Sequence, residues 1–198
     1  MKTIPVTLLA GALVFAAAAA DAQQKPMRIR GTITAFDGTM LSVQSTDGKA
    51  LQLRMTDKST VAAAKAIPLT DLKKGDYVGS TTVKNADGVL VAREVHRIPR
   101  SVKEGHGPWD SLPNSMMTNA SVASVVPVTG GEQLTLEYSG GSQKILVPPG
   151  TPIVMTAPAD RSFLKPGEYV FVAAQAGADG TITALRIQVS HGGVKPPQ

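Results

Sequence analysis

The sequence lacks cysteine and contains few aromatic residues. Without cysteine the chain can form neither a disulfide nor a thioether link to a lipid, so burial and hydrogen bonding must hold it together. Aromatic residues make up only 4% of the chain, too few for the row of stacking rings that a single-stranded nucleic-acid site requires. The net charge of +5 therefore indicates attraction to an acidic partner, or a basic surface that is simply solvated, and not a nucleic-acid site.

Catalytic motifs are also missing. The chain has three histidines and contains no Gly-x-Ser-x-Gly elbow, no His-Glu-x-x-His pair and no phosphate-binding loop. Asp110 lies near His106 in the sequence, but no nucleophile accompanies the pair. We therefore predict a protein that is not an enzyme, with no catalytic residues and no cofactor apart from the soft metal ion considered below.

Only one long apolar run is present, and it lies at the N-terminus. Lys2 precedes it, residues 8–20 form it, and residues 20–22 (Ala-Asp-Ala) provide small side chains at a cleavage position. The run is shorter than the roughly 20 residues that a spanning helix needs. The pattern predicts a signal peptide at residues 1–22 that is cleaved near Ala22. We expect the mature chain in the periplasm, with no transmembrane span left after cleavage.

The chain contains an internal duplication. Residues 72–78 (LKKGDYV) recur as residues 164–170 (LKPGEYV), an offset of 92 positions. The Ala-Asp-Gly of residues 86–88 recurs at residues 178–180 with the same offset. Two copies of about 70 residues are too few and too long to be the units of a solenoid. The repeat therefore predicts two domains of the same kind.

Each copy has the pattern of short β-strands. Apolar residues alternate with polar ones in runs that are separated by turn sequences such as Asp37-Gly38, and no long helical pattern is present. We therefore predict an all-β chain made of two tandem, six-stranded OB-like β-barrels at residues 28–98 and 119–190. The fourth strand of each copy is short. We place it at residues 60–61 in the first copy and at residues 152–154 in the second. The alternative in the first copy is one helical turn at residues 61–66, whose extension Pro68 limits.

Three sequence features occur together in this chain. They are the strand-hairpin opening of residues 31–38 (GTITAFDG), the Leu-Lys-x-Gly-[Asp/Glu]-Tyr-Val turn and the Ala-Asp-Gly hairpin. Through them the sequence resembles an uncharacterised family of exported bacterial domains, small β-barrels that often occur in tandem. The resemblance covers both copies, although the second copy departs from the opening pattern at residues 125–127. It implies the fold and the export but no established activity.

The segment between the copies differs from a flexible linker. Residues 99–118 form an irregular connector that contains Trp109, the single tryptophan, and two adjacent methionines. One interpretation is structural, in which the Trp109 ring covers the gap between the barrels. The other is contact with a partner, either an envelope protein or an anionic envelope component, for which we select Trp109, Arg97, Arg100, Lys103 and Asp110. After the second copy, the polar residues 191–198 are expected to be disordered.

A non-enzymatic periplasmic binding or assembly factor is therefore the leading prediction. The alternative is a soft-metal binding protein of the copper type. In that alternative His106, Met116 and Met117 would coordinate the ion, because imidazole and thioether groups suit Cu(I). The alternative requires these three side chains to converge on one point.

Overall fold

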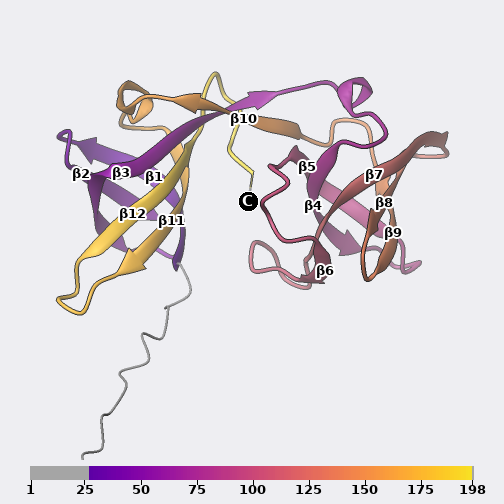
Figure 1. Ribbon diagram of the computed structural model, residues 1–198, viewed down its shortest axis with the longest axis horizontal. Coiled ribbons are helices and arrows are strands. Elements are labelled where there is room, and N and C mark those ends of the chain that lie inside the picture. The colour runs from indigo at the N-terminus through magenta and orange to yellow at the C-terminus, as the bar shows by residue number, and fades with distance from the viewer. Residues whose placement is uncertain (1–26, 198) are drawn as a thin grey trace, which may run out of the picture.

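The computed structural model describes residues 27–197, so the predicted signal peptide lies outside the described residues. Residues 27–197 form twelve β-strands and two single-turn 3-10 helices, which confirms the all-β prediction (Figure 1). Among them, no helix has the length and apolar character needed to cross a membrane. The elements are β1 (Met27–Phe36), β2 (Met40–Ser45), β3 (Ala50–Ala66), η1 (Leu69–Asp71), β4 (Tyr77–Lys84), β5 (Leu90–Arg97), β6 (Gly105–Pro108), β7 (Met116–Val128), β8 (Gly131–Tyr138), β9 (Gly141–Val147), β10 (Ile153–Ala159), η2 (Arg161–Phe163), β11 (Tyr169–Ala176) and β12 (Ile182–Val189).

The first barrel is a closed ring of five strands, in the order β1-β2-β3-β12-β11 and back to β1. Neighbouring strands run antiparallel except β3 and β12, which are parallel and place Leu53 opposite Ile182. Alternate residues of each strand point into the ring, and this is why the apolar positions of the sequence have a period of two.

The second barrel repeats the same plan with the order β7-β8-β9-β5-β4 and back to β7. Here β5 and β9 are the parallel pair, and Leu90 lies opposite Ile145. Leu90 and Ile145 are related to Ile182 and Leu53 by an offset of 92 positions (182 − 90 and 145 − 53), the same offset at which residues 72–78 recur. The short strand β6 lies outside the ring and extends its sheet by pairing with β7.

The two barrels exchange strands between the sequence copies (Figure 1). The first barrel takes β1, β2 and β3 from the first copy but β11 and β12 from the second. The second barrel takes β4 and β5 from the first copy and β7, β8 and β9 from the second. The barrels therefore do not coincide with residues 28–98 and 119–190, for which we expected one barrel each. Each copy supplies part of both.

The apolar cores show the same division. The first core combines residues 29–63 with residues 164–189, and the second combines residues 72–95 with residues 120–153. Leu72 packs in the second core, whereas its counterpart Leu164 packs in the first. The turns that follow these leucines lead to Val78 and Val170, which are both fully buried. The duplicated LKxG[D/E]YV segment thus completes a different barrel in each copy.

Strands β3 and β10 cross between the barrels and pair antiparallel with each other. Ala64 lies opposite Thr156 in this pair. Since 156 − 64 is also 92, each of these residues is the counterpart of the other. A pseudo-two-fold axis therefore passes through the Ala64–Thr156 pair and relates one barrel to the other.

Each barrel has five strands and not the predicted six, because the fourth strand of each copy leaves its barrel. In the first copy, residues 61–66 form neither a separate strand nor a helical turn but continue β3, which is 17 residues long. In the second copy, residues 148–150 (Pro-Pro-Gly) separate β9 from β10, since proline cannot donate to a strand ladder and Gly150 has a φ of 81°. The two fourth strands pair with each other and form the bridge between the barrels.

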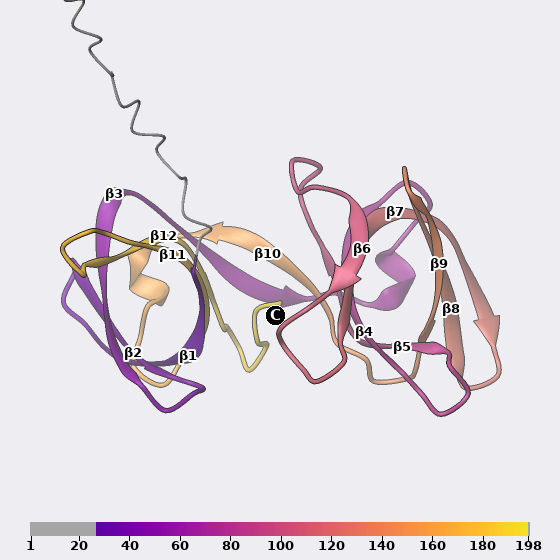
Figure 2. The ribbon, with the colours of Figure 1, turned by 90° about the horizontal axis from the view of Figure 1, so that it is seen from below.

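The C-terminal tail is structured over residues 191–197, where we expected disorder over residues 191–198. His191 and Val194 form a β-bridge, and Pro196 and Pro197 are buried. Figure 1 and Figure 2 both place the last described residues between the two barrels. A short turn reverses the chain after β12, and burial of the two prolines then holds the tail in place.

Candidate functional site

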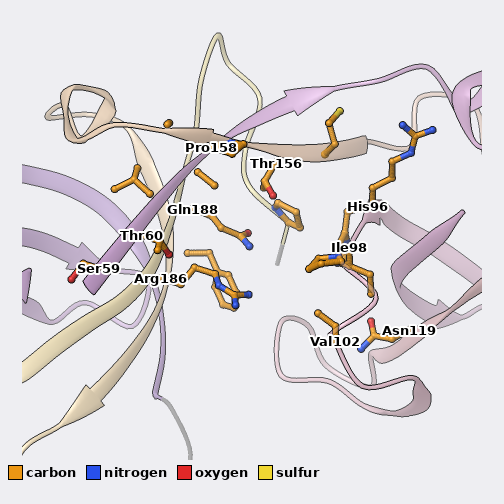
Figure 3. Close-up of a pocket in the computed structure, with 18 of the residues that line it drawn as sticks. Ser59, Thr60, His96, Ile98, Val102, Asn119, Thr156, Pro158, Arg186 and Gln188 are labelled. Atoms are coloured by element: carbon orange, nitrogen blue, oxygen red, sulfur yellow. The ribbon is translucent and has the colours of Figure 1, made fainter. Parts of the chain in front are cut away.

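A cavity of about 920 Å³ lies between the two barrels, and we call it the inter-barrel cavity (Figure 3). Its walls come from β11 and β12 of the first barrel, from β5 and β7 of the second and from the bridge of β3 and β10. The connector and the tail add Trp109 and Pro197. Binding sites for small molecules commonly measure about 300–1,000 Å³. Because the cavity lies between two strand-exchanged barrels, neither copy contains it alone.

The first barrel supplies Arg186, Gln188 and Phe171 to the cavity wall. Figure 3 shows Arg186 and Gln188 directed from β12 toward the space between the barrels. The Arg186 side chain is exposed and makes no hydrogen bond or ion pair within the described part of the chain. The Oε1 atom of Gln188 is buried and has no hydrogen-bond partner among residues 27–197. This wall therefore holds one available cation and one available acceptor for a ligand.

The second barrel supplies His96, Met117 and Asn119. The His96 side chain is buried, and its Nδ1 atom lies 3.4 Å from Oε1 of Glu94. The two atoms lack hydrogen-bond geometry, so Nδ1 has no hydrogen-bond partner within the described residues. Gly79 on the neighbouring strand makes room for the ring, because a Cβ atom there would lie 2.5 Å from Nε2 of His96. A second unsatisfied polar atom thus belongs to a cavity-lining residue on the opposite barrel.

The two walls are symmetry counterparts but differ in chemistry. His96 corresponds to Gln188, and Glu94 corresponds to Arg186, each with the offset of 92 positions. Phe171 gives the first barrel an aromatic ring where the second barrel has a glycine. The pseudo-two-fold axis therefore does not extend to the chemistry of the lining. Such a cavity suits an occupant with two unlike ends.

The connector fastens the two barrels together through Trp109 and Asp110. The guanidinium carbon of Arg28 on β1 lies 4.2 Å from the centre of the Trp109 ring. Arg28 and Arg30 both donate to the Asp110 carboxylate, over 3.2 and 2.8 Å. Burial alone would raise the pKa of Asp110, but the hydrogen bonds and charges of Arg30 and Arg28 outweigh it and hold the pKa below its usual value. Trp109 lines the cavity from this junction.

The other residues selected for partner contact lie apart from that junction. Arg97 lines the cavity, but its Nη2 atom donates to Oδ2 of Asp76 over 2.9 Å. Arg100 lies outside the lining, and its Nη2 atom donates to the carbonyl of Gly75 over 2.7 Å. Lys103 also lies outside the lining and is exposed. The two arginines thus hold the turn before β4 and leave less charge available to a ligand than the sequence suggests.

The structure does not bring the three predicted metal ligands to one point. His106 and Met116 lie on one face of the β6–β7 ladder, where Nδ1 of His106 is 2.9 Å from Oγ1 of Thr118. Met117 follows Met116 on the same strand and therefore points to the opposite face, where it lines the inter-barrel cavity. Burial, with a smaller effect from the charge of Lys84, lowers the pKa of His106. No cluster of three or more His, Cys, Asp or Glu side chains suited to a metal occurs among residues 27–197.

Sequence reasoning did not select Arg186, Gln188 or Phe171. They lie on strands whose alternation predicts only that such side chains point away from the barrel core. The offset that makes His96 the counterpart of Gln188 is visible in the sequence. It does not show that the two residues line one cavity, because that depends on how the two barrels face each other. The cavity is therefore a property of the arrangement of the barrels.

One family of known proteins matches part of the chain. The family described as "Domain of unknown function (DUF5666)" matches residues 123–188, about a third of the sequence. This agrees with the resemblance to an uncharacterised family and carries no activity. No curated protein matches the sequence significantly. The matched residues run from β7 to β12 and so contribute strands to both barrels, which means that the family unit does not close a barrel by itself in this chain.

Proposed function

We propose that this protein is a non-enzymatic binding or assembly factor of the periplasm that holds a segment of another envelope component in the inter-barrel cavity. The cavity itself carries the proposal. Its walls combine apolar surface with an exposed guanidinium group and two residues that have buried, unsatisfied polar atoms. Buried polar atoms are normally hydrogen-bonded, so the unpaired Oε1 atom of Gln188 on this wall favours a ligand that completes it.

The groups around the cavity are suited to holding a ligand rather than transforming it. Arg186, Gln188 and Asn119 provide hydrogen bonds, while Phe171 and Met117 provide apolar contact. Two closed barrels joined by the pairing of β3 with β10 hold these groups in place before a ligand arrives, and such preorganisation lowers the entropic cost of binding. Placement in the periplasm rests on the N-terminal pattern of residues 1–22, and an anionic region of the partner would suit the net charge of +5.

Site-specific photo-crosslinking in living cells tests this function. A benzophenone side chain in place of Met155 would face the cavity, and the same group in place of Gln52 would lie on the outer surface of the first barrel. We expect a discrete adduct with an envelope component from position 155 only. The adduct should weaken with Arg186→Glu but not with Arg54→Glu, a control arginine outside the cavity. An adduct that forms equally from both positions, or that ignores Arg186→Glu, would contradict the proposal.

A further inference from the structure

We propose that the segment held in the inter-barrel cavity is an extended, proline-containing peptide, and that the protein's own tail occupies one end of the same site. This inference rests on the proposed binding function of the cavity. Pro197 of the tail forms part of the cavity wall, and the described chain ends there. The cavity still measures about 920 Å³ with the tail in place, so a longer peptide that displaces the tail has room to continue past it.

The path of the tail is specified by the sequence. Gly192 and Gly193 have φ values of 57° and 80°, a region that glycine enters without strain. They form a two-residue turn that is closed by hydrogen bonds of 3.1 and 3.0 Å between the backbones of His191 and Val194. The His191 ring also contacts the Phe163 ring at 5.1 Å between centroids. This turn reverses the chain after β12 and directs the following residues into the cavity.

The residues after the turn have a restricted backbone. Lys195 and Pro196 each precede a proline, which disfavours the helical region, and the proline rings fix their own φ near −65°. Residues 195–197 therefore favour the extended polyproline II conformation. Nζ of Lys195 lies 5.1 Å from the centre of the Tyr169 ring, and both prolines are buried. A Lys-Pro-Pro segment thus lies against the first barrel, and its last residue, Pro197, reaches the cavity wall.

The first copy also has a turn at the equivalent place, but of a different type, because Arg100 and Ser101 lack the positive φ of Gly192 and Gly193. The backbone N–H of Val102 donates to the carbonyl of Pro99 over 3.0 Å, and these residues correspond to Val194 and His191 with the offset of 92 positions. Val102 lines the cavity from the other side. The first copy then continues as the connector, whereas the second continues as Pro196-Pro197. A post-strand segment therefore enters the cavity wall from each barrel, and only one of them carries the two prolines.

The cavity lining matches the chemistry of a polyproline II segment. Such a segment presents proline rings and solvated carbonyl groups but few N–H groups, and it is recognised by aromatic-lined grooves with hydrogen-bond donors. Trp109 and Phe171 supply aromatic surface. The amide groups of Gln188 and Asn119 and the guanidinium of Arg186 supply donors. Oε1 of Gln188 remains available to an N–H group from a residue other than proline.

A small inorganic anion fits the lining less well. Three arginines line the cavity, but Arg161 donates to the carbonyls of Gly38 and Thr56, both over 2.7 Å, and Arg97 is paired with Asp76. One available guanidinium among mainly apolar groups does not form a multidentate anion site. Binding of phosphate in place of the peptide is an outcome that the test below can detect.

Nuclear magnetic resonance of the full chain provides a direct test, because the cavity contains side chains with their own N–H signals. The Pro196→Ala/Pro197→Ala variant would weaken the packing of the tail against the cavity wall. The probes are the peptide acetyl-Val-Lys-Pro-Pro-Gln-amide and a matched peptide with alanine at both proline positions. The readouts are the side-chain amide signals of Gln188 and Asn119 and the indole signal of Trp109.

We expect the proline peptide to shift these signals saturably in the variant. The affinity should be at least about tenfold weaker in the unaltered chain, because a tethered tail competes at an effective concentration in the millimolar range. The alanine peptide should cause no comparable shift. If the Pro196→Ala/Pro197→Ala variant is not folded, Gly193→Val tests the same point, since a β-branched residue is strained at a φ of 80° and should disrupt the turn.

Equal shifts from both peptides, or no shift in either variant, would overturn the assignment of a proline-containing partner. Shifts with inorganic phosphate alone would replace it with an anion. Those results would leave the cavity-dependent adduct from position 155 intact if the proposed function is right. Loss of that adduct, by contrast, would refute the function of the cavity itself, so the two failures are distinguishable.

Discussion

Replacing Leu53 with alanine should loosen strands of the other sequence copy. Leu53 is fully buried in the first core and lies opposite Ile182 of β12. A buried leucine that is truncated to alanine costs about 2–5 kcal/mol. A loss of about 3 kcal/mol at about 1.4 kcal/mol per factor of ten accelerates amide exchange that depends on opening of the barrel by about 100-fold. Hydrogen exchange followed by mass spectrometry can locate that acceleration along the chain.

Because the barrels exchange strands, the strands in which hydrogen exchange accelerates distinguish this fold from one barrel per copy. The acceleration in Leu53→Ala should appear in β11 and β12, which close the same barrel, and much less in β4 and β5, which belong to the same sequence copy. Ile145 is the counterpart of Leu53 and is fully buried in the second core. Ile145→Ala should therefore give the reciprocal result, with faster exchange in β4 and β5. If Leu53→Ala accelerated β4 and β5 while β11 and β12 stayed protected, each copy would form its own barrel and our account of the fold would be wrong.

Three further predictions concern the junction and the cavity. Gly79→Ala places a Cβ atom 2.5 Å from Nε2 of His96, so the ring must move. We expect the free energy of unfolding, measured by chemical denaturation, to fall by about 1–3 kcal/mol, and the magnetic resonance signals of the His96 ring to shift. Unchanged ring signals would contradict the packing of His96 against Gly79. Asp110→Asn removes two partly exposed ion pairs and should lower the free energy of unfolding by at most about 1 kcal/mol. The pKa of Asp110 is lowered in the folded state, so its contribution to stability is complete above about pH 4 and is lost as the pH falls through the folded pKa. The melting temperatures of the unaltered chain and Asp110→Asn should therefore converge in acid. A difference that stays constant with pH would show that the ion pairs of Asp110 are not its cause. Trp109→Ala removes the ring that Arg28 covers and should lower the free energy of unfolding by about 0.5–2 kcal/mol. An unchanged melting curve would show that the Trp109 ring does not stabilise the contact between the connector and β1.

The strands could be predicted from the sequence, but their partners could not. Alternation of apolar and polar residues in segments such as Leu51 to Met55 shows which side chains enter a core. The two copies are so similar that Leu53 would find an apolar neighbour in either Leu90 or its counterpart Ile182. The choice depends on whether residues 61–66 turn back or continue straight, and an alanine-rich segment carries no signal for a turn. Continuation of β3 moves β4 and β5 to the other barrel.

The site was less accessible to sequence reasoning than the strands. Trp109 and Asp110 could be selected from the sequence as contact residues because they lie in an irregular connector between the two copies. Their partners Arg28 and Arg30 lie about 80 positions away on β1, and no local pattern connects them. The order of the tail was predictable in part, because two adjacent glycines commonly mark a turn. The polar composition of residues 191–198, which favours disorder, obscured this signal.

The exchange of strands also sets the order in which the protein can fold. The parallel pair that closes the second barrel joins Leu90 to Ile145, which are 55 positions apart, whereas the pair that closes the first joins Leu53 to Ile182, 129 positions apart. Closing a longer loop costs more entropy and slows folding. As the chain is made from its N-terminus, the second barrel can be completed while β1, β2 and β3 still wait for β11 and β12. Of the described strands, those synthesised first, β1, β2 and β3, are thus the last to be enclosed, and their unpaired edges are where aggregation would begin.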